Sequence, residues 1–313
     1  MSTTQYSTRI LARADFPETL RNMHRPPASL HIAGDLPPPH YKYLCVIGSR
    51  AFSSYGKEAC RKIIGGLAGH PICIVSGMAM GIDSIAHEAA LEAGLSTIAF
   101  PGSGLNYDAL YPVSKRPLAL NILEQGGALL SKFRPDQMGG DWTFPVRNEL
   151  MAGISHAVLV IEAGRGSGTL ITAQYATDFN RDIMAVPGRI DTELSYGPHM
   201  LIQRGAATIT CAEDILHEFG LAERIEEPLV KKRTYKKSTG ESGPSSRQSV
   251  INLEILNLSA EEKRICSFLK IESLSATDLI EKTGLSPVQL NIIMSELEMK
   301  NIIKEENGRY GMK

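Results

Sequence analysis

Short apolar runs recur through the middle of the chain, and amphipathic stretches separate most of them. The runs are Tyr43–Ile47, Ile72–Val75, Thr97–Phe100, Ala128–Leu130, Ala157–Ile161, Ile183–Val186 and Ala207–Thr210. The amphipathic stretches include Tyr55–Ala68, Ile82–Ala93 and Leu170–Asn180. Continuous apolar strands that alternate with helices indicate a parallel sheet with helices on both faces. The pattern therefore predicts a doubly wound α/β domain over residues 41–220.

The rest of the chain forms three further segments. Residues 1–40 are rich in proline and have no regular period, so we expect an irregular N-terminal segment. Residues 221–250 contain few apolar side chains, which is typical of a flexible linker. Residues 251–313 return to helical periodicity and predict a second, smaller domain.

The C-terminal segment predicts three helices followed by a short ribbon. The expected helices cover residues 260–269, 275–283 and 288–300, and the ribbon pairs Ile302–Lys304 with Arg309–Gly311. Ser259 and Glu262 have the spacing of a capping box before the first helix. This order is typical of a winged helix. Glu296 and Glu298 lie on the helix that would be the recognition helix. A protein that reads the major groove needs basic side chains there, so a role in protein contacts is favoured over DNA recognition.

Composition narrows the class of protein. The chain is 43% hydrophobic, as in a globular protein, and no apolar run is long enough for a membrane span. The first residues lack the apolar block of a secretory signal. The five cysteines are widely spaced without a CxxC pair, which disfavours a disulfide scaffold or a zinc site and favours a cytoplasmic location.

The charges of the whole chain nearly cancel, with 33 Lys+Arg against 34 Asp+Glu. Any affinity for nucleic acid must therefore come from a local basic surface. The segment Lys231–Lys237 (KKRTYKK) is basic and contains no acid. It is either a solvated linker or a basic arm that adds salt-dependent DNA affinity.

The predicted strands end in turns rich in glycine and serine. These turns are Gly48-Ser49-Arg50, Ser76-Gly77, Pro101-Gly102-Ser103-Gly104, Glu162–Thr169 and Pro187-Gly188. In an open parallel sheet the carboxyl ends of the strands lie together, and ligands bind in the crevice outside them. Backbone N–H groups and helix N-termini favour an anion there. The turns therefore predict a phosphate-binding edge.

The motifs narrow the kind of phosphate ligand. The first turn does not match GxGxxG and the second strand ends in Ser76 instead of an acid, which disfavours NAD. No GxxxxGK[ST] is present, which disfavours a P-loop NTPase. Arg50 places a planar cationic fork in the middle of the edge, a group well suited to phosphate. The pattern predicts no metal site and no cofactor.

The sequence in and around these turns resembles that of the DNA-processing protein A family, also called DprA or Smf. Members of that family are bacterial recombination mediators that bind single-stranded DNA. The matching blocks are VIGSR (46–50), SGMAMGIDSIAHEAAL (76–91), PGSGLNYDALYP (101–112), LLS (129–131), FPVRN (144–148), AGIS (152–155), LVIEAGRGSGTLITAQYA (159–176), DIMAVPG (182–188) and LIQRGA (201–206). They come in family order. The resemblance implies an extended Rossmann-like, doubly wound parallel sheet followed by a small winged-helix domain.

The resemblance also implies a function. The protein would bind single-stranded DNA, protect it and help to load the RecA recombinase during DNA uptake, transformation and recombination, without catalysis. It would form a homodimer through the Rossmann-like domain, with no membrane insertion. By position, the DNA-binding residues would be Gly48, Ser49, Arg50, Ser76, Gly77, Gly102, Gly104, Phe144, Arg147, Asn148, Ser167, Gly168 and Thr169. Phe144 would be either a base-stacking platform or a core aromatic.

The chain departs from the family pattern in its charges. Lys132 stands where the family commonly has Glu, Glu149 where it has Arg, and Lys115 where it has Asn. We expect Lys132 and Glu149 to form a charge-reversed pair. If they lie apart, Lys132 would be an added phosphate contact. Lys115 would add positive charge at the mouth of the groove, so both lysines join the DNA-binding candidates.

An enzyme is the alternative. Related Rossmann-like proteins of the lysine-decarboxylase-like and phosphoribohydrolase group cleave nucleotides at a Pro-Gly-Gly-x-Gly-Thr turn. Glu162 beside Gly164–Thr169 resembles their catalytic glutamate. However, the second glycine of that motif is absent, and Glu162 precedes the turn instead of following it.

Overall fold

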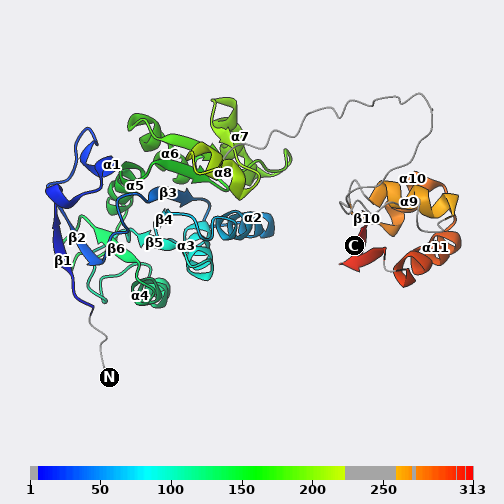
Figure 1. Ribbon diagram of the computed structural model, residues 1–313, viewed down its shortest axis with the longest axis horizontal. Helices are drawn as coiled ribbons and strands as arrows, with labels where there is room; N and C mark the ends of the chain where they lie inside the picture. The colour runs from blue at the N-terminus through cyan, green and yellow to red at the C-terminus, as the bar shows by residue number, and fades with distance from the viewer. Residues whose placement is uncertain (1–5, 223–258, 270–272, 301, 307, 313) are drawn as a thin grey trace, which may run out of the picture. The chain divides into compact units, whose positions relative to one another are not determined.

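The structure is a computed structural model that describes residues 6–222, 259–269, 273–300, 302–306 and 308–312. The chain divides into two compact units, Met1–Leu229 and Val230–Lys313, which we describe separately (Figure 1). Most of the linker predicted over residues 221–250, including Lys231–Lys237, lies outside the described residues. No described helix has the length and apolar character needed to cross a bilayer.

A 9-stranded sheet forms the centre of the first unit. Its strands are β1 (Arg9–Ala12), β2 (Ser29–Gly34), β3 (Lys42–Ile47), β4 (Ile72–Ser76), β5 (Ser96–Ala99), β6 (Ala128–Ser131), β7 (Ala157–Val160), β8 (Asp182–Ala185) and β9 (Ala207–Thr208). Their spatial order is β1-β2-β6-β5-β4-β3-β7-β8-β9. The strands from β3 to β9 are parallel and correspond to the predicted apolar runs. The parallel α/β prediction is therefore confirmed.

The N-terminal segment differs from the sequence prediction. Residues 1–40 were expected to be irregular, but β1 and β2 join the sheet, and β2 pairs antiparallel with β6. Leu30 and Ile32 alternate along β2 and are fully or almost fully buried, while the short helix α1 (Glu18–Arg21) buries Leu20. The prolines that dominate this segment lie between these short elements and mask their periodicity. The sheet therefore begins well before residue 41.

Helices cover both faces of the sheet (Figure 1). They are α2 (Ser54–Gly65), α3 (Ile82–Glu92), α4 (Arg116–Glu124), α5 (Thr143–Ile154), α6 (Thr169–Asp178), α7 (Tyr196–Gln203) and α8 (Ala212–Glu218), with short 3-10 turns at Arg13–Asp15, Val113–Lys115 and Glu193–Ser195. Side chains of α1, α5, α6 and α7 pack on one face. Those of α2, α3, α4 and α8 pack on the other.

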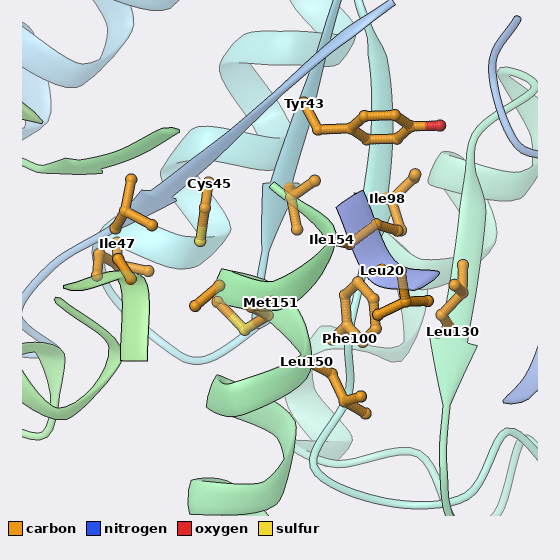
Figure 2. Close-up of a cluster of buried hydrophobic side chains, with 14 of the residues drawn as sticks. Leu20, Tyr43, Cys45, Ile47, Ile98, Phe100, Leu130, Leu150, Met151 and Ile154 are labelled. Atoms are coloured by element: carbon orange, nitrogen blue, oxygen red, sulfur yellow. The ribbon is translucent and has the colours of Figure 1, made fainter. Parts of the chain in front are cut away.

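The strands are apolar on both sides because each face has its own core. Along β3, Tyr43 and Cys45 belong to the cluster under α5, whereas Leu44 and Val46 belong to the cluster under α2 and α3. This alternation follows from the period of two in a strand. Figure 2 shows the α5 side, where residues of α5 pack towards Phe100 on the sheet.

In the second unit, the described residues form three helices and a 3-stranded sheet in the order β10-β12-β11. Its elements are α9 (Ala260–Leu269), β10 (Leu274–Ser275), α10 (Ala276–Thr283), α11 (Pro287–Met299), β11 (Ile303–Glu306) and β12 (Arg309–Met312). Ser275 and Ser286 cap α10 and α11 with capping boxes, and Gly284 ends α10 at φ 72°. The predicted helices and ribbon are present in the expected order, and the assignment to the winged-helix class stays a prediction.

Candidate nucleic-acid interface

The order of the strands reverses at β3. From β3 the chain moves outward through β4, β5 and β6, and then returns to β7 on the other side of β3. The turns after β3 and β7 therefore diverge and leave a crevice at the carboxyl edge of the sheet. The backbone N–H of Ser49 donates to the carbonyl of Glu162 at 2.8 Å, which holds the two turns together at the base of this crevice.

A groove of about 610 Å³ lies at this switch point. It is lined by the turn after β3, the turn after β7, the first two turns of α5, and Asp83 of α3. The predicted DNA-binding residues among its lining are Gly48, Ser49, Arg50, Phe144, Arg147, Asn148, Ser167, Gly168 and Thr169. A smaller cavity of about 30 Å³ adjoins it and adds Gly77 and Gly102, sharing Arg50, Phe144 and Arg147 with the groove. The structure thus brings together most residues of the predicted phosphate edge.

Glycine is required where these turns press against each other. A Cβ on Gly48 would lie 2.6 Å from Cγ1 of Ile82, at the start of α3. Gly81, with φ 91°, precedes that helix, and a Cβ on it would lie 2.7 Å from Cα of Arg50. Most side chains avoid that positive φ, and a methyl group at either position would separate the turns.

Phe144 lies between two arginines. Its ring centroid is 5.6 Å from Cζ of Arg50 and 5.9 Å from Cζ of Arg147, and the ring of Tyr111 is tilted against it at 5.8 Å. Gly102 makes this position possible, because a Cβ there would lie 2.5 Å from the Phe144 ring. Phe144 is half-buried and lines both cavities, so it is not a core aromatic. An exposed cation beside an aromatic face suits a phosphate next to a base.

The two arginines differ in how they are held. Arg147 is 5% exposed and donates to the carbonyls of Phe100, at 3.0 Å, and Gly77. Burial lowers its pKa, and the nearby carboxylate of Asp83 opposes that shift; burial raises the pKa of Asp83, and Arg147 opposes that shift in turn. Arg147 therefore anchors α5 to the strand ends. Arg50 is exposed and makes no ion pair with any described residue, which leaves its guanidinium available for a ligand.

The turn after β7 supplies the opposite wall. The Ser167 hydroxyl donates to Oγ1 of Thr169 at 3.0 Å and accepts from the Thr169 backbone N–H at 3.3 Å. Gly168 is the N-cap of α6, and the N–H groups of Leu170 and Ile171 donate to the carbonyls of Ser167 and Gly168, at 3.0 and 3.2 Å. The dipole of α6 makes this wall favourable for an anion.

Arg165 is a groove residue that the sequence prediction missed. Its guanidinium stacks 4.0 Å from the centroid of Tyr196, and its backbone N–H donates to Oε1 of Glu193 at 3.1 Å. It is exposed and lines the groove opposite the turn that carries Arg50. Its place inside the glycine-rich turn was a usable signal. Asp83 and Asp141 also line the groove and were not predicted.

Four predicted DNA-binding residues do not line either cavity: Ser76, Gly104, Lys115 and Lys132. Ser76 is fully buried and donates its hydroxyl to the carbonyl of Val46 at 2.7 Å. The N–H of Gly104 donates to the carbonyl of Gln137 at 2.7 Å. Both groups hold the turns together and do not face the groove.

The three residues whose charge departs from the family pattern also have surroundings that differ from those expected. Nζ of Lys115 lies 3.4 Å from Oε1 of Glu88. The other carboxylate oxygen of Glu88, Oε2, lies 3.7 Å from Nη2 of Arg61. Lys132 is exposed after β6, and Glu149 is half-buried on α5. Among the ion pairs of the described residues, none joins Lys132 to Glu149, so the expected charge-reversed pair is not supported.

Glu162 is buried and hydrogen-bonded to the residue that caps α2. It is 4% exposed and accepts hydrogen bonds from the backbone N–H and the hydroxyl of Ser53, at 2.9 and 2.5 Å. Ser53 is the N-cap of α2, and Gly56 on that helix leaves no room for a Cβ beside the carboxylate. Both carboxylate oxygens of Glu162 are therefore occupied by hydrogen bonds from the N-cap residue of α2. Within the described residues, no group of three or more His, Cys, Asp or Glu side chains could hold a metal ion.

The doubly wound sheet defines a Rossmann-like protein, with a cationic, glycine-lined groove at its switch point. The family model for DNA recombination-mediator protein A matches residues 7–220, so this chain belongs to that family. The match begins before β1, in agreement with the place of the N-terminal strands in the sheet.

Relatives agree with this assignment. Protein Smf of Escherichia coli strain K12 is 41% identical over 218 residues, which cover 69% of this chain and 55% of that relative; the chain thus spans about half of that protein. The crystal structure of DNA processing protein A from Streptococcus pneumoniae matches with a TM-score of 0.62 and 36% identity, covering 69% of this chain and 75% of that one. The Helicobacter pylori protein, whose structure is described for its single-stranded DNA binding mode, matches with a TM-score of 0.60 and 26% identity over 69% of this chain and 96% of that one.

Proposed function

We propose that this chain binds single-stranded DNA along the switch-point groove, with phosphates held by Arg50 and the turn Gly164–Thr169. The observation that carries this proposal is the exposed guanidinium of Arg50, which makes no ion pair with a described residue and lies beside the Phe144 ring in the groove that the N-terminus of α6 also lines. An aromatic ring next to a phosphate-binding cation fits an unpaired base. The single-stranded DNA binding mode described for the Helicobacter pylori relative supports the same choice.

We further propose that the bound strand is protected and passed to the RecA recombinase during DNA uptake and recombination, that the protein acts in the cytoplasm, and that two copies associate through the Rossmann-like domain. Family membership supports these steps. The chain acts without catalysis in this proposal, because Glu162, its best candidate for a catalytic acid, is engaged at the start of α2.

A titration with oligo-dT and with duplex of equal length tests strand preference. We expect tighter binding of oligo-dT, with log K falling linearly against log salt by about 0.7 for each phosphate contacted, between about 50 and 200 mM salt. Equal affinity for both forms, or no binding of oligo-dT at low salt, would reject the proposal.

The RecA step has its own test. The rate of RecA filament assembly on oligo-dT is measured with the chain, without it, and with an Arg50→Ala variant. We expect acceleration by the chain and less acceleration by the variant at equal concentration. Unchanged assembly rates would remove RecA loading from the function while leaving DNA binding in place.

A further inference from the structure

Three aromatic side chains lie at or near the α5 side of the groove: the exposed Tyr111 and Trp142 and the half-buried Phe144. We call these three residues the aromatic strip. Trp142 is 61% exposed and Tyr111 is 43% exposed, although both are large enough to contribute strongly to a core. Neither was a candidate from the sequence, and Trp142 is the chain's only tryptophan.

Two rings of the strip lie against each other, and Trp142 stands two residues before Phe144 at the start of α5. The Tyr111 ring lies 5.8 Å from that of Phe144. A Cβ on Gly139 would lie 3.2 Å from Cβ of Tyr111, and one on Gly140 would lie 3.8 Å from Nε1 of Trp142. The segment between Tyr111 and Trp142 therefore carries no side chain of its own that would cover either ring.

Trp142 is held in place although it is exposed. Its ring meets Phe133 edge to face, with centroids 5.4 Å apart and planes at 89°. Phe133 is buried just after β6, and Trp142 is the N-cap residue of α5, so the contact joins a buried ring to the start of a helix. A supported indole loses little freedom when a flat partner stacks on it, which favours binding.

The chemistry of the surroundings selects one occupant. The groove beside the strip is lined by the exposed arginines Arg50 and Arg165, which suit a phosphate backbone, whereas an exposed aromatic face suits a base. Asp141 is exposed next to Trp142 and lines the groove, so it keeps the phosphates nearer Arg50. Unpaired bases of the same strand meet both requirements.

We propose that Trp142 is a base-stacking platform that extends the path of single-stranded DNA beyond Phe144 and out of the groove. This inference rests on the proposed DNA-binding function. It assigns to the aromatic strip a second subsite, for one or more bases of any sequence, because every base has a π-face.

The single tryptophan makes a direct test possible. The full chain is titrated with fluorescein-labelled oligo-dT for anisotropy, and with unlabelled oligo-dT for tryptophan emission. We expect the emission to be quenched in parallel with binding. Binding with unchanged emission would overturn this inference alone, whereas no binding at low salt would overturn the proposed function as well.

Affinity provides the second readout. Because stacking of one base contributes about 1–3 kcal/mol, Trp142→Leu should weaken oligo-dT binding at least about fivefold, and Trp142→Phe should restore most of the loss. Ile190→Ala is the matched control, since Ile190 is 96% exposed and lines neither cavity of the DNA path, and it should leave affinity unchanged. With an oligonucleotide made of abasic sites, wild type and Trp142→Leu should bind equally. A Trp142→Leu defect that persists on the abasic strand would show a structural role and overturn the proposal.

Discussion

The two edges of the same sheet carry cavities of comparable size, and only one of them has the properties of a binding site for a phosphate chain. The carboxyl-edge groove has a volume of about 610 Å³, and the cavity at the amino edge, near the starts of β3 and β7, has about 750 Å³. Volume alone therefore does not distinguish the two edges. The difference lies in what surrounds the cations of each cavity.

At the amino edge one arginine is engaged by backbone carbonyls, and two acids share the cavity with the other cations. Arg181 donates through Nη2 to the carbonyls of Thr19, at 2.6 Å, and Gly153, at 3.1 Å. Asp15 and Glu18 share the lining with Arg21 and Lys42. At the carboxyl edge Arg50 makes no ion pair with a described residue, lies beside the Phe144 ring and lines the same groove as the N-terminus of α6. The arginine beside an aromatic ring, and not the volume of the cavity, therefore distinguishes the carboxyl edge.

The largest expected effect separates the edges through a matched pair of exposed arginines, Arg50 and Arg21. Arg50→Ala should weaken oligo-dT binding about tenfold to a hundredfold, because a hydrogen bond to a charged group contributes about 1.5–3 kcal/mol. Arg21→Ala, which removes the same side chain from the amino-edge cavity, should change affinity less than about twofold. Fluorescence anisotropy at one salt concentration measures both.

Equal losses in the two variants would mean that general charge, not the groove, binds DNA. The salt dependence provides an independent control, since loss of one phosphate contact should lower the slope of log K against log salt by about 0.7. An Arg50→Ala variant with a full slope and a full affinity would remove Arg50 from the site.

The second prediction concerns how the carboxyl edge is closed, and it compares two of its glycines. Gly48→Ala places a methyl group 2.6 Å from Ile82 and should lower the free energy of unfolding by about 1–3 kcal/mol, as overpacking does. Gly168→Ala meets no atom within 4 Å and should change it by less than about 0.5 kcal/mol. Urea unfolding measures both. Equal midpoints would contradict the close contact between the β3 turn and α3.

The third prediction uses a histidine of the amino edge. Burial lowers the pKa of His156 to about 4, and its Nδ1 accepts from the backbone N–H of Tyr43 at 2.9 Å. A histidine with a lowered pKa binds fewer protons folded than unfolded. Its contribution to stability is therefore complete above the ordinary value of 6.5 and is lost as pH falls from there towards 4.

Buried His87, whose pKa burial lowers to about 3, acts in the same direction, at up to about 1.4 kcal/mol per pH unit. His156→Asn should therefore flatten the decline in urea midpoint between pH 7 and pH 5 only in part, because His87 remains and solvent screens the half-buried His156. Oligo-dT affinity at pH 7 should not change. A loss of affinity would indicate that the amino edge takes part in binding.

The sequence predicted the structure best where polar and glycine-rich turns come directly after apolar strands. Apolar runs located β3 to β9, and the turns after β3 and β7 located the groove, because parallel strands bring their carboxyl ends together. The sequence was less informative for β1 and β2, whose short runs are interrupted by prolines. It also missed Trp142, because a residue outside any motif becomes a candidate only when its exposure and its neighbours are known.

The ion-pair partners of surface residues could not be predicted from the sequence either, and Lys115 shows why. Its place in the motif after β5 suggested added positive charge at the mouth of the groove, yet what an ammonium group does depends on the nearest carboxylate in space. That carboxylate is Glu88, on α3, which also lies near Arg61. No periodicity or spacing along the chain relates these three positions.

The smallest expected effect tests this last point. Since Lys115 is paired with Glu88 and lines neither cavity, Lys115→Ala should change oligo-dT affinity less than about twofold and the free energy of unfolding by less than about 1 kcal/mol, as for a surface ion pair. Glu88→Gln, which frees the ammonium group, is the informative companion. If Lys115 lies within reach of the strand, Glu88→Gln should raise affinity and the salt slope together, and a double variant with Lys115→Ala should lose that gain. No gain in Glu88→Gln would place Lys115 outside the DNA path, and the contrast between free and engaged cations would then hold within the carboxyl edge as well as between the two edges.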